Sequence, residues 1–366
     1  MLAGAVRSAS HARDAPKVPK IHGDPGSLPM VSIVVPARNE ERGIEAAVRS
    51  LAAQTVREFE IVVVDDRSTD RTREMLRRLE TELPRLRVVD GAEVPEGWMG
   101  KPWALEEGVR ASRGEWLLFT DADVKHAPEA LASALRFALE RRLDALSLLW
   151  EIEIGSFAEA AILPHILAVI LLATGPVSAI NDPARTDRAA ATGAFILMRR
   201  AALAALGGHT ELRGEVVEDI EIARLIKRDG RFRFCLAEGR DLISLRMYHS
   251  FAEIWNGFTK NVFMALHEDV PTAVASFILL SAVSWVPPAL AMRALLRRRP
   301  LDFVESLASS VLLIATSAWG IRARGLDARL GFGAPLGLAT LAAITANSAL
   351  RSMLGRGVVW RGRTYR

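Results

Sequence analysis

Four long stretches without Asp, Glu, Lys or Arg constrain this 366-residue chain more than any other feature. They are Ala160–Asn181, Val270–Met292, Ser306–Ile321 and Leu330–Leu350. Because crossing a bilayer takes about 20 mostly apolar residues, the last three predict a C-terminal membrane module. Mean hydropathy is +0.17 although 25% of the residues are charged, which is typical of a polar domain joined to membrane segments.

The first stretch, Ala160–Asn181, is a poor candidate for a spanning helix because it contains Pro164 and the Gly175-Pro176 pair. We expect it to lie in the membrane interface or to line an apolar groove, and a buried core helix is an equal alternative. In Val270–Met292, the Pro287-Pro288 pair predicts a kink or a break.

The first 29 residues contain no apolar run long enough for a signal peptide, and their composition predicts a disordered basic tail. A transit peptide is the alternative. The net charge of +4 fits anionic partners such as nucleotide diphosphates or an anionic membrane face. Basic blocks interleaved with aromatic residues are missing from the sequence, so nucleic acid is not an expected partner. The single cysteine, Cys235, excludes an intrachain disulfide and a cysteine-cluster metal site.

Between the tail and the apolar stretches, short β-branched runs alternate with helical patterns. The predicted strands are Met30–Val35, Glu60–Val64, Arg87–Val89 and Glu115–Thr120, and the predicted helices are Glu40–Gln54, Arg71–Leu83 and Pro102–Ser112. This alternation predicts a doubly wound, mostly parallel α/β sheet. Ligands bind such sheets beyond the carboxyl ends of the strands, where this sequence carries polar residues.

Asp121 and Asp123 follow the fourth predicted strand directly. Two carboxylates at a strand end can hold one Mg²⁺ or Mn²⁺ ion, which keeps coordination places for phosphate oxygens. Two solvated loop acids are the alternative. After the first two strands, Arg38 could contact a phosphate, and the acids at Asp65-Asp66 could accept hydrogen bonds from a ribose or from uracil. A G-x-G-x-x-G motif does not follow the first strand, which disfavours a dinucleotide fold.

The runs VSIVVPARNEE, EIVVVDDRSTDRT, GWMGKPWAL and LLFTDADV together resemble family 2 glycosyltransferases, over roughly residues 30–235. The resemblance implies the GT-A fold and an inverting enzyme that uses a nucleotide sugar, with a UDP-sugar as the expected donor. It implies that Lys101 lies near the nucleotide and that Asp121 and Asp123 hold metal and diphosphate. The residues that it assigns to the nucleotide itself are Pro36, Arg38, Glu40, Asp65 and Asp66.

The Glu218-Asp219 pair stands where the family carries its catalytic base. The resemblance therefore assigns Asp219 as the base and Glu218 as the residue that helps to position it. Inversion requires a carboxylate that removes the acceptor hydroxyl proton during attack on the anomeric carbon. The alternative is that these acids only stabilise the first turn of a helix.

Processive members of the family carry Q-x-x-R-W after the base, and this chain lacks that motif. Its W-N-G-F-T-K-N run instead resembles lipid-directed members, such as hopanoid-associated, carotenoid and ceramide glycosyltransferases. A membrane lipid is therefore the expected acceptor. Lys260 or His249 would replace the missing arginine at the diphosphate.

The sequence thus predicts a glycosyltransferase domain over residues 30–262 and membrane-associated helices with a basic tail over residues 263–366. We expect a multi-pass protein of the inner membrane whose catalytic domain and Trp360–Tyr365 tail face the cytoplasm, with one apolar stretch, Val270–Met292, interfacial or re-entrant. Two alternatives remain open at this point: a sugar nucleotidyltransferase with a GT-A-like fold, and a non-catalytic membrane scaffold.

Overall fold

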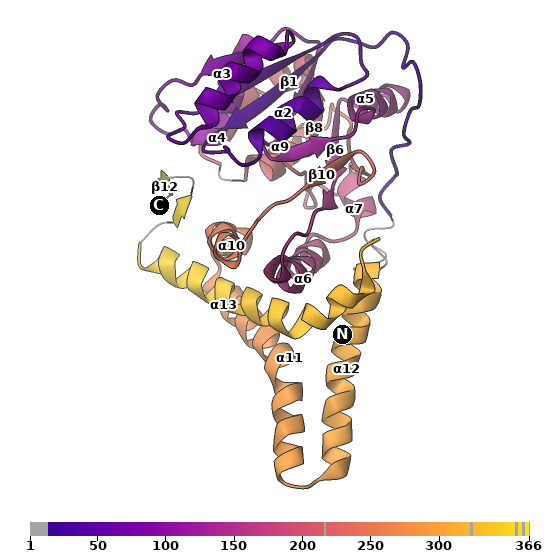
Figure 1. Cartoon of the computed structure of the whole chain (residues 1–366), viewed down its shortest axis with the longest axis vertical. Helices are drawn as coiled ribbons and strands as arrows, with labels where there is room; N and C mark the ends of the chain where they lie inside the picture. The colour runs from indigo at the N-terminus through magenta and orange to yellow at the C-terminus, as the bar shows by residue number, and fades with distance from the viewer. Residues whose placement is uncertain (1–13, 216, 323–324, 356–357, 361–362, 366) are drawn as a thin grey trace. The chain divides into compact units, whose positions relative to one another are not determined.

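The computed structural model describes residues 14–215, 217–322, 325–355, 358–360 and 363–365. The chain forms two compact units, which are considered separately (Figure 1). The α/β unit contains Ala15–Glu153 and Val177–Met247, and the helical unit contains Ile154–Pro176 and the described residues from Tyr248 onward.

A seven-stranded mixed sheet forms the centre of the α/β unit, in the order β3-β2-β1-β4-β8-β6-β9. Its strands are β1 (Val31–Ala37), β2 (Phe59–Asp65), β3 (Leu86–Asp90), β4 (Trp116–Phe119), β6 (Ala145–Leu149), β8 (Ile196–Arg199) and β9 (Phe234–Glu238). Only β8 runs antiparallel to its neighbours, β4 and β6. A second sheet joins β5 (Val124–His126), β10 (Ile243–Leu245) and β7 (Glu151–Ile152).

Helices cover both faces of the large sheet. This is required because successive buried side chains of β1 point to opposite faces. Ile33 and Val35 belong to one buried cluster and Val34 to another on the opposite face. The first face receives α2 (Ile44–Ala52), α3 (Thr72–Glu82) and α5 (Ala130–Glu140), and the second receives α4 (Gly100–Ala111), α8 (Arg200–Ala205), η1 (Gly208–Leu212) and α9 (Glu218–Asp229). The short helix α7 (Val177–Asn181) packs against β9. The predicted mostly parallel α/β architecture is confirmed.

The N-terminal segment differs from the disordered tail that its composition predicts. Residues 1–13 lie outside the described part of the chain, but residues 15–29 belong to the α/β unit and pack on it. The backbone of Lys17 forms an isolated parallel β-bridge with Glu238 at the edge of the sheet, and Val18 is 1% exposed. The backbone N–H of Ile21 donates to Ser133 Oγ. One buried valine and a few backbone hydrogen bonds order this segment, and composition does not reveal them.

The helical unit contains α6 (Phe157–Thr174), α10 (Phe251–Ala265), α11 (Val270–Leu296), α12 (Pro300–Arg322), η2 (Ala328–Gly333) and α13 (Ala334–Met353). A hairpin of β11 (Val358–Trp360) and β12 (Arg363–Tyr365) follows, and residues 361–362 of the predicted tail lie outside the described part. Pro287 and Pro288 lie inside α11, so the predicted break does not occur there. Four helical segments among the described residues are long and apolar enough to cross a membrane: Phe157–Thr174, Val270–Leu296, Pro300–Arg322 and Ala328–Met353.

Identical S-F-A-E motifs begin α6 and α10, close to the points where the chain enters the helical unit. Ser156 Oγ accepts from the N–H of Glu159, and Ser250 Oγ accepts from the N–H of Glu253. Each glutamate in turn accepts from the N–H of the residue before the serine, at 2.9 and 2.8 Å. These reciprocal bonds satisfy N–H groups that the first turn leaves without helical partners.

Inside the helical unit, α13 lies across one end of the α11–α12 hairpin and also packs against α6 and α10 (Figure 1). His165 of α6 is buried, with Nδ1 3.0 Å from Ser317 Oγ and Nε2 3.1 Å from the carbonyl oxygen of Leu330. The segment predicted as Ala160–Asn181 is therefore divided, because α6 packs with the C-terminal helices and α7 belongs to the α/β unit. The chain passes from one compact unit to the other at residues 153–154, 176–177 and 247–248. The domain boundary predicted at residue 262 stays a prediction for the functional domains.

Candidate active site

The parallel strands β1, β2 and β4 end at one edge of the large sheet. Ala37 pairs with Asp65, and Val34 pairs with Phe119. The residues that follow these strands therefore meet at the same edge, as the sequence predicts.

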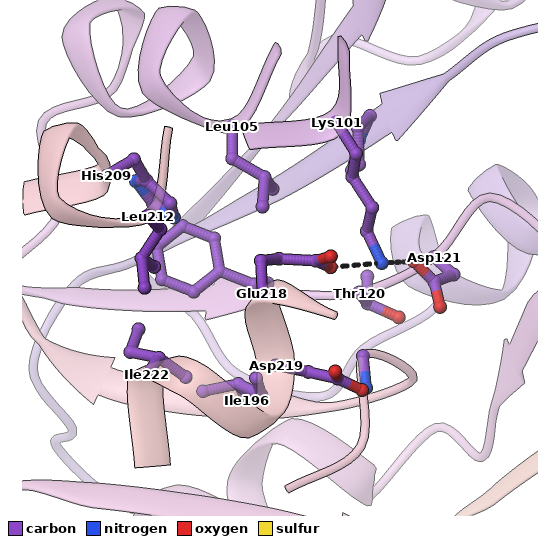
Figure 2. Close-up of a pocket in the computed structure, with 13 residues that line it drawn as sticks. Lys101, Leu105, Thr120, Asp121, Ile196, His209, Leu212, Glu218, Asp219 and Ile222 are labelled. Atoms are coloured by element: carbon purple, nitrogen blue, oxygen red, sulfur yellow. Dashed lines mark hydrogen bonds and ion pairs between the residues drawn. The ribbon is translucent and has the colours of Figure 1, made fainter. Parts of the chain in front are cut away.

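A pocket lies at this edge, between the sheet, α4, η1 and the N-terminus of α9 (Figure 2). Both polar and apolar side chains line it. Thirteen residues line it: Pro36, Lys101, Leu105, Phe119, Thr120, Asp121, Gly193, Ile196, His209, Leu212, Glu218, Asp219 and Ile222. Five of them are predicted site residues, namely Pro36, Lys101, Asp121, Glu218 and Asp219. The pocket thus brings together the two groups of acids that lie far apart in the sequence.

Lys101 connects these two groups. Its Nζ lies 2.6 Å from Asp121 Oδ1 and 2.6 Å from Glu218 Oε1 (Figure 2). Burial by itself lowers the pKa of Lys101, but Asp121, Glu218 and Asp219 outweigh burial and raise it well above its ordinary value. Lys101 therefore stays positively charged. A cation in the first turn of α4 opposes the helix dipole, so local helix stability does not explain this lysine.

Asp219 stands in the first turn of α9, where its carboxylate accepts the N–H of Gly193 at 2.9 Å and its own Oδ1 accepts the N–H of Ile220 at 2.9 Å. Burial is the largest cause that raises the pKa of Asp219, to about 7, and the neighbouring Glu218 and Asp121 act in the same direction. Lys101 and the Gly193 N–H oppose them. A carboxyl group with a pKa near neutrality can accept a proton during a reaction at physiological pH.

Asp121 and Asp123 fit a hard divalent cation by their chemistry, as two carboxylates two residues apart at a strand end. Groups of three or more His, Cys, Asp or Glu side chains that could hold a metal do not occur in the described part of the chain. Two protein carboxylates suffice for an ion whose other ligands are water and substrate phosphates. Asp123 does not line the pocket, and its Cβ packs beside Gly43.

Of the predicted nucleotide residues, Asp65 ends β2, Asp66 follows it directly, and Arg38 and Glu40 lie in the loop after β1. Asp65 and Asp66 are 3% and 5% exposed, and Asp65 Oδ1 accepts the N–H of Ser68. Arg38 donates to the carbonyl oxygen of Asp66 at 2.6 Å, so in this structure it fastens one loop to the other. The N–H of Glu40 donates to Thr72 Oγ1 at 2.7 Å. These residues do not line the pocket, and their contacts with a nucleotide stay predictions.

Lys260 belongs to α10 in the helical unit, so its predicted contact with the diphosphate also stays a prediction.

Sequence reasoning missed several lining residues. Gly193 donates to Asp219, and a side chain there would meet Lys101 and Asp121. Thr120 donates to the carbonyl oxygen of Ala194 at 2.7 Å. His209 is buried, which lowers its pKa to about 4, and its ring packs edge-on against Phe119. The glycine in the run Thr192-Gly193-Ala194-Phe195 is a signal that could have pointed to Gly193, whereas His209 carries no recognisable motif.

Comparisons with known proteins agree with this geometry. The family model for "Glycosyl transferase family 2" matches residues 32–207. A 4,4'-diaponeurosporenoate glycosyltransferase from Staphylococcus haemolyticus is 24% identical over 254 residues, which cover 68% of this chain and 65% of that protein. A beta-monoglucosyldiacylglycerol synthase from a Nostoc species is 35% identical over 108 residues, covering 29% of this chain and 23% of that protein. The chain thus spans less than two thirds of the length of these relatives.

Among solved structures, a mannosyltransferase from Pyrobaculum calidifontis in complex with GDP-Man and Mn²⁺ matches 97% of this chain and 99% of its own, with 21% identity and a TM-score of 0.52. The α/β unit therefore has a fold of the GT-A type. Residues 32–207 match the family 2 glycosyltransferases, and the relative that matches a longer part of the chain is also a glycosyltransferase. The predicted fold class and the predicted resemblance to this family are confirmed.

Proposed function

We propose that the protein transfers a sugar, with inversion, from a nucleotide-sugar donor to a hydroxyl group of a membrane lipid. The observation that carries the proposal is that Asp121, Glu218 and Asp219 line one pocket, in which Lys101 pairs with both Asp121 and Glu218. Donor chemistry and proton removal can then take place within one site.

Asp219 is the proposed base. The acceptor oxygen attacks the anomeric carbon as its proton passes to the Asp219 carboxylate, and the bond from that carbon to the diphosphate oxygen breaks. Its pKa of about 7 supports this role, since an ordinary aspartate is a far weaker base. Glu218, the preceding residue, would help to position Asp219, and its own carboxylate pairs with Lys101 at 2.6 Å.

The donor is a nucleotide sugar, with UDP as the proposed nucleotide. Asp121 and Asp123 would hold a Mg²⁺ or Mn²⁺ ion, which neutralises charge on the departing diphosphate when it is bound. The mannosyltransferase of similar fold, which is in complex with GDP-Man and Mn²⁺, supports both the donor class and the metal. Pro36, Arg38, Glu40, Asp65 and Asp66 are the proposed nucleotide contacts, with Lys260 at the diphosphate.

The proposed acceptor is a lipid, supported by relatives named for a carotenoid acid and a diacylglycerol. The bilayer itself would be contacted by the helical unit. Of the 18 consecutive residues that make each helix apolar enough to cross a membrane, only 11% are buried within the protein in α11 and 22% in α12. The corresponding shares are 39% in Phe157–Thr174 and 50% in Ala328–Met353. We therefore propose that α11 and α12 cross the membrane as a hairpin and that α6 and α13 lie in the interface.

Two crossings return the chain to the side from which it came. Nucleotide sugars are available in the cytoplasm, so the α/β unit and the C-terminal tail would face the cytoplasm at the inner membrane. In this topology the hairpin replaces the re-entrant Val270–Met292 of the sequence prediction. The arginines at 297–299 would lie on the outer face, against the usual charge bias, so topology needs its own test.

Replacement of Asp219 tests the function. Membranes with the wild-type protein should transfer radiolabelled sugar from a UDP-sugar to extractable lipid, and Asp219→Asn should lose at least about 100-fold, in line with the worth of a positioned base. Binding of UDP with Mn²⁺, measured by calorimetry, should survive.

Asp229→Asn, at the other end of α9, is the matched control, because Asp229 pairs only locally with Arg231. Turnover retained in Asp219→Asn would remove Asp219 from its role. Pyrophosphate release without lipid labelling would instead support a nucleotidyltransferase.

A further inference from the structure

Lys101 is the only lysine or arginine among the thirteen residues that line the described pocket. Its Nζ lies 2.6 Å from Asp121 Oδ1 and 2.6 Å from Glu218 Oε1, and Asp219 is a third carboxylate that lines the same pocket. The side chains of Lys101 and Asp121 are 36% and 32% exposed, whereas that of Glu218 is 8% exposed. The ammonium group therefore joins a partly exposed acid on the proposed donor side of the pocket, Asp121, to a buried acid next to the proposed base, Glu218.

A divalent metal and Lys101 need the same atoms. Mg²⁺ binds carboxylate oxygens at about 2.0–2.1 Å, and Lys101 Nζ already lies 2.6 Å from Asp121 Oδ1. Two like charges held by one carboxylate repel each other strongly where water is partly excluded, and a divalent ion doubles this repulsion. An ammonium group and a metal ion would therefore compete for Asp121.

Lys101 can leave Asp121 without losing all of its partners, because Glu218 holds it at the same distance of 2.6 Å on the other side. The backbone leaves room for the ammonium group: a Cβ at Gly193 would lie 2.9 Å from Lys101 Nζ and 3.1 Å from Asp121 Oδ2. A lysine stem has four flexible carbons, so a shift of the ammonium group towards α9 needs no backbone movement.

We propose that Lys101 is a built-in counter-ion that competes with the divalent metal for Asp121 and moves onto Glu218 and Asp219 when the metal binds. Arrival of the metal-bound donor would then transfer one positive charge from the donor side of the pocket to the base side. Donor loading and preparation of the base become one coupled event. The inference rests on the proposed function only for the identity of the metal site.

Binding of Mn²⁺ alone tests the competition without any turnover. Free Mn²⁺ is measured by electron paramagnetic resonance during titration of the full-length protein in detergent. Lys101→Met removes the competitor, so it should bind Mn²⁺ about tenfold more tightly than the wild-type protein or better. Lys101→Arg keeps the charge and should bind as weakly as the wild-type protein, and Asp121→Asn should lose this binding.

Lys17→Met is the matched control for the loss of one charge, because Lys17 is exposed and pairs with Asp241 in the same unit. It should leave Mn²⁺ affinity unchanged. Lys101→Gln provides a second neutral variant, and the melting temperature of each metal-free variant shows that it is folded.

Equal or weaker Mn²⁺ binding in folded Lys101→Met and Lys101→Gln, or no Mn²⁺ binding by any of these proteins, would overturn the proposal. Lipid glycosylation by the wild-type protein could still be observed in that case, so failure of this inference differs from failure of the proposed function.

Discussion

At the scale of single residues, the reaction depends on the ionisation of Asp219. The pKa of this carboxyl group is raised to about 7 in the free protein. We predict that kcat/KM for transfer rises with pH along a limb centred near pH 7, because the deprotonated form is the base. The pKa values of the buried His126 and His209 are lowered to about 3 and about 4, so neither ring produces that limb. A limb centred below pH 5 would contradict the assignment.

The same ionisation has a cost in stability. Between about pH 4 and pH 7 the folded protein holds a proton on Asp219 that the unfolded chain has lost, so stability falls as the pH rises through this range. After a discount for solvent screening we expect Asp219→Asn to gain about 1–2 kcal/mol at pH 8, which is about 2–8 °C in melting temperature. At pH 4 the gain should vanish. Melting curves at the two pH values measure this, and an equal shift at both would contradict it.

At the scale of helices and strands, the close approach of α6 and α13 depends on a glycine. A Cβ at Gly337 would lie 2.7 Å from His165 Cδ2 and 2.9 Å from the carbonyl oxygen of Ala161. Gly337→Ala should therefore destabilise the helical unit by about 1–3 kcal/mol through overpacking. Gly320→Ala in α12 is the matched control, because a Cβ there meets no heavy atom within 4 Å.

Thermal unfolding in detergent compares the two variants. Gly320→Ala should be neutral or slightly stabilising, since alanine favours helices more than glycine does. Equal melting temperatures for Gly337→Ala and the wild-type protein would mean that α6 and α13 do not pack in this way.

The sequence predicted some elements better than others, for a physical reason. Buried parallel strands are short β-branched runs, and β1, β2 and β4 appear in the sequence with their polar ends. Apolar helices look alike whether they face lipid or protein, so the sequence did not reveal that Phe157–Thr174 packs with the C-terminal helices. In the site, motifs supplied Asp121, Glu218 and Lys101, but the ion pairs that join Lys101 to both acids depend on tertiary contacts that spacing does not encode.

At the scale of the whole molecule, the proposed hairpin topology can be tested with engineered cysteines. The chain has one cysteine, Cys235, which is buried and has its pKa raised to about 11, so its background labelling should be low. Arg298→Cys at the hairpin tip should react with a membrane-impermeant maleimide in intact cells. Leu354→Cys, after α13, should react only after the cells are opened. Labelling of Leu354→Cys from outside would contradict two crossings.

Acids far apart in the chain are proposed to serve one transfer of a sugar to a membrane lipid. Mass spectrometry of total lipids from cells that express the wild-type protein, Asp219→Asn or Asp229→Asn detects the product of this transfer. We predict a lipid heavier by one sugar residue in the wild-type and Asp229→Asn cells and its absence with Asp219→Asn. The same glycolipid at equal abundance in Asp219→Asn cells would mean that Asp219 does not serve the transfer.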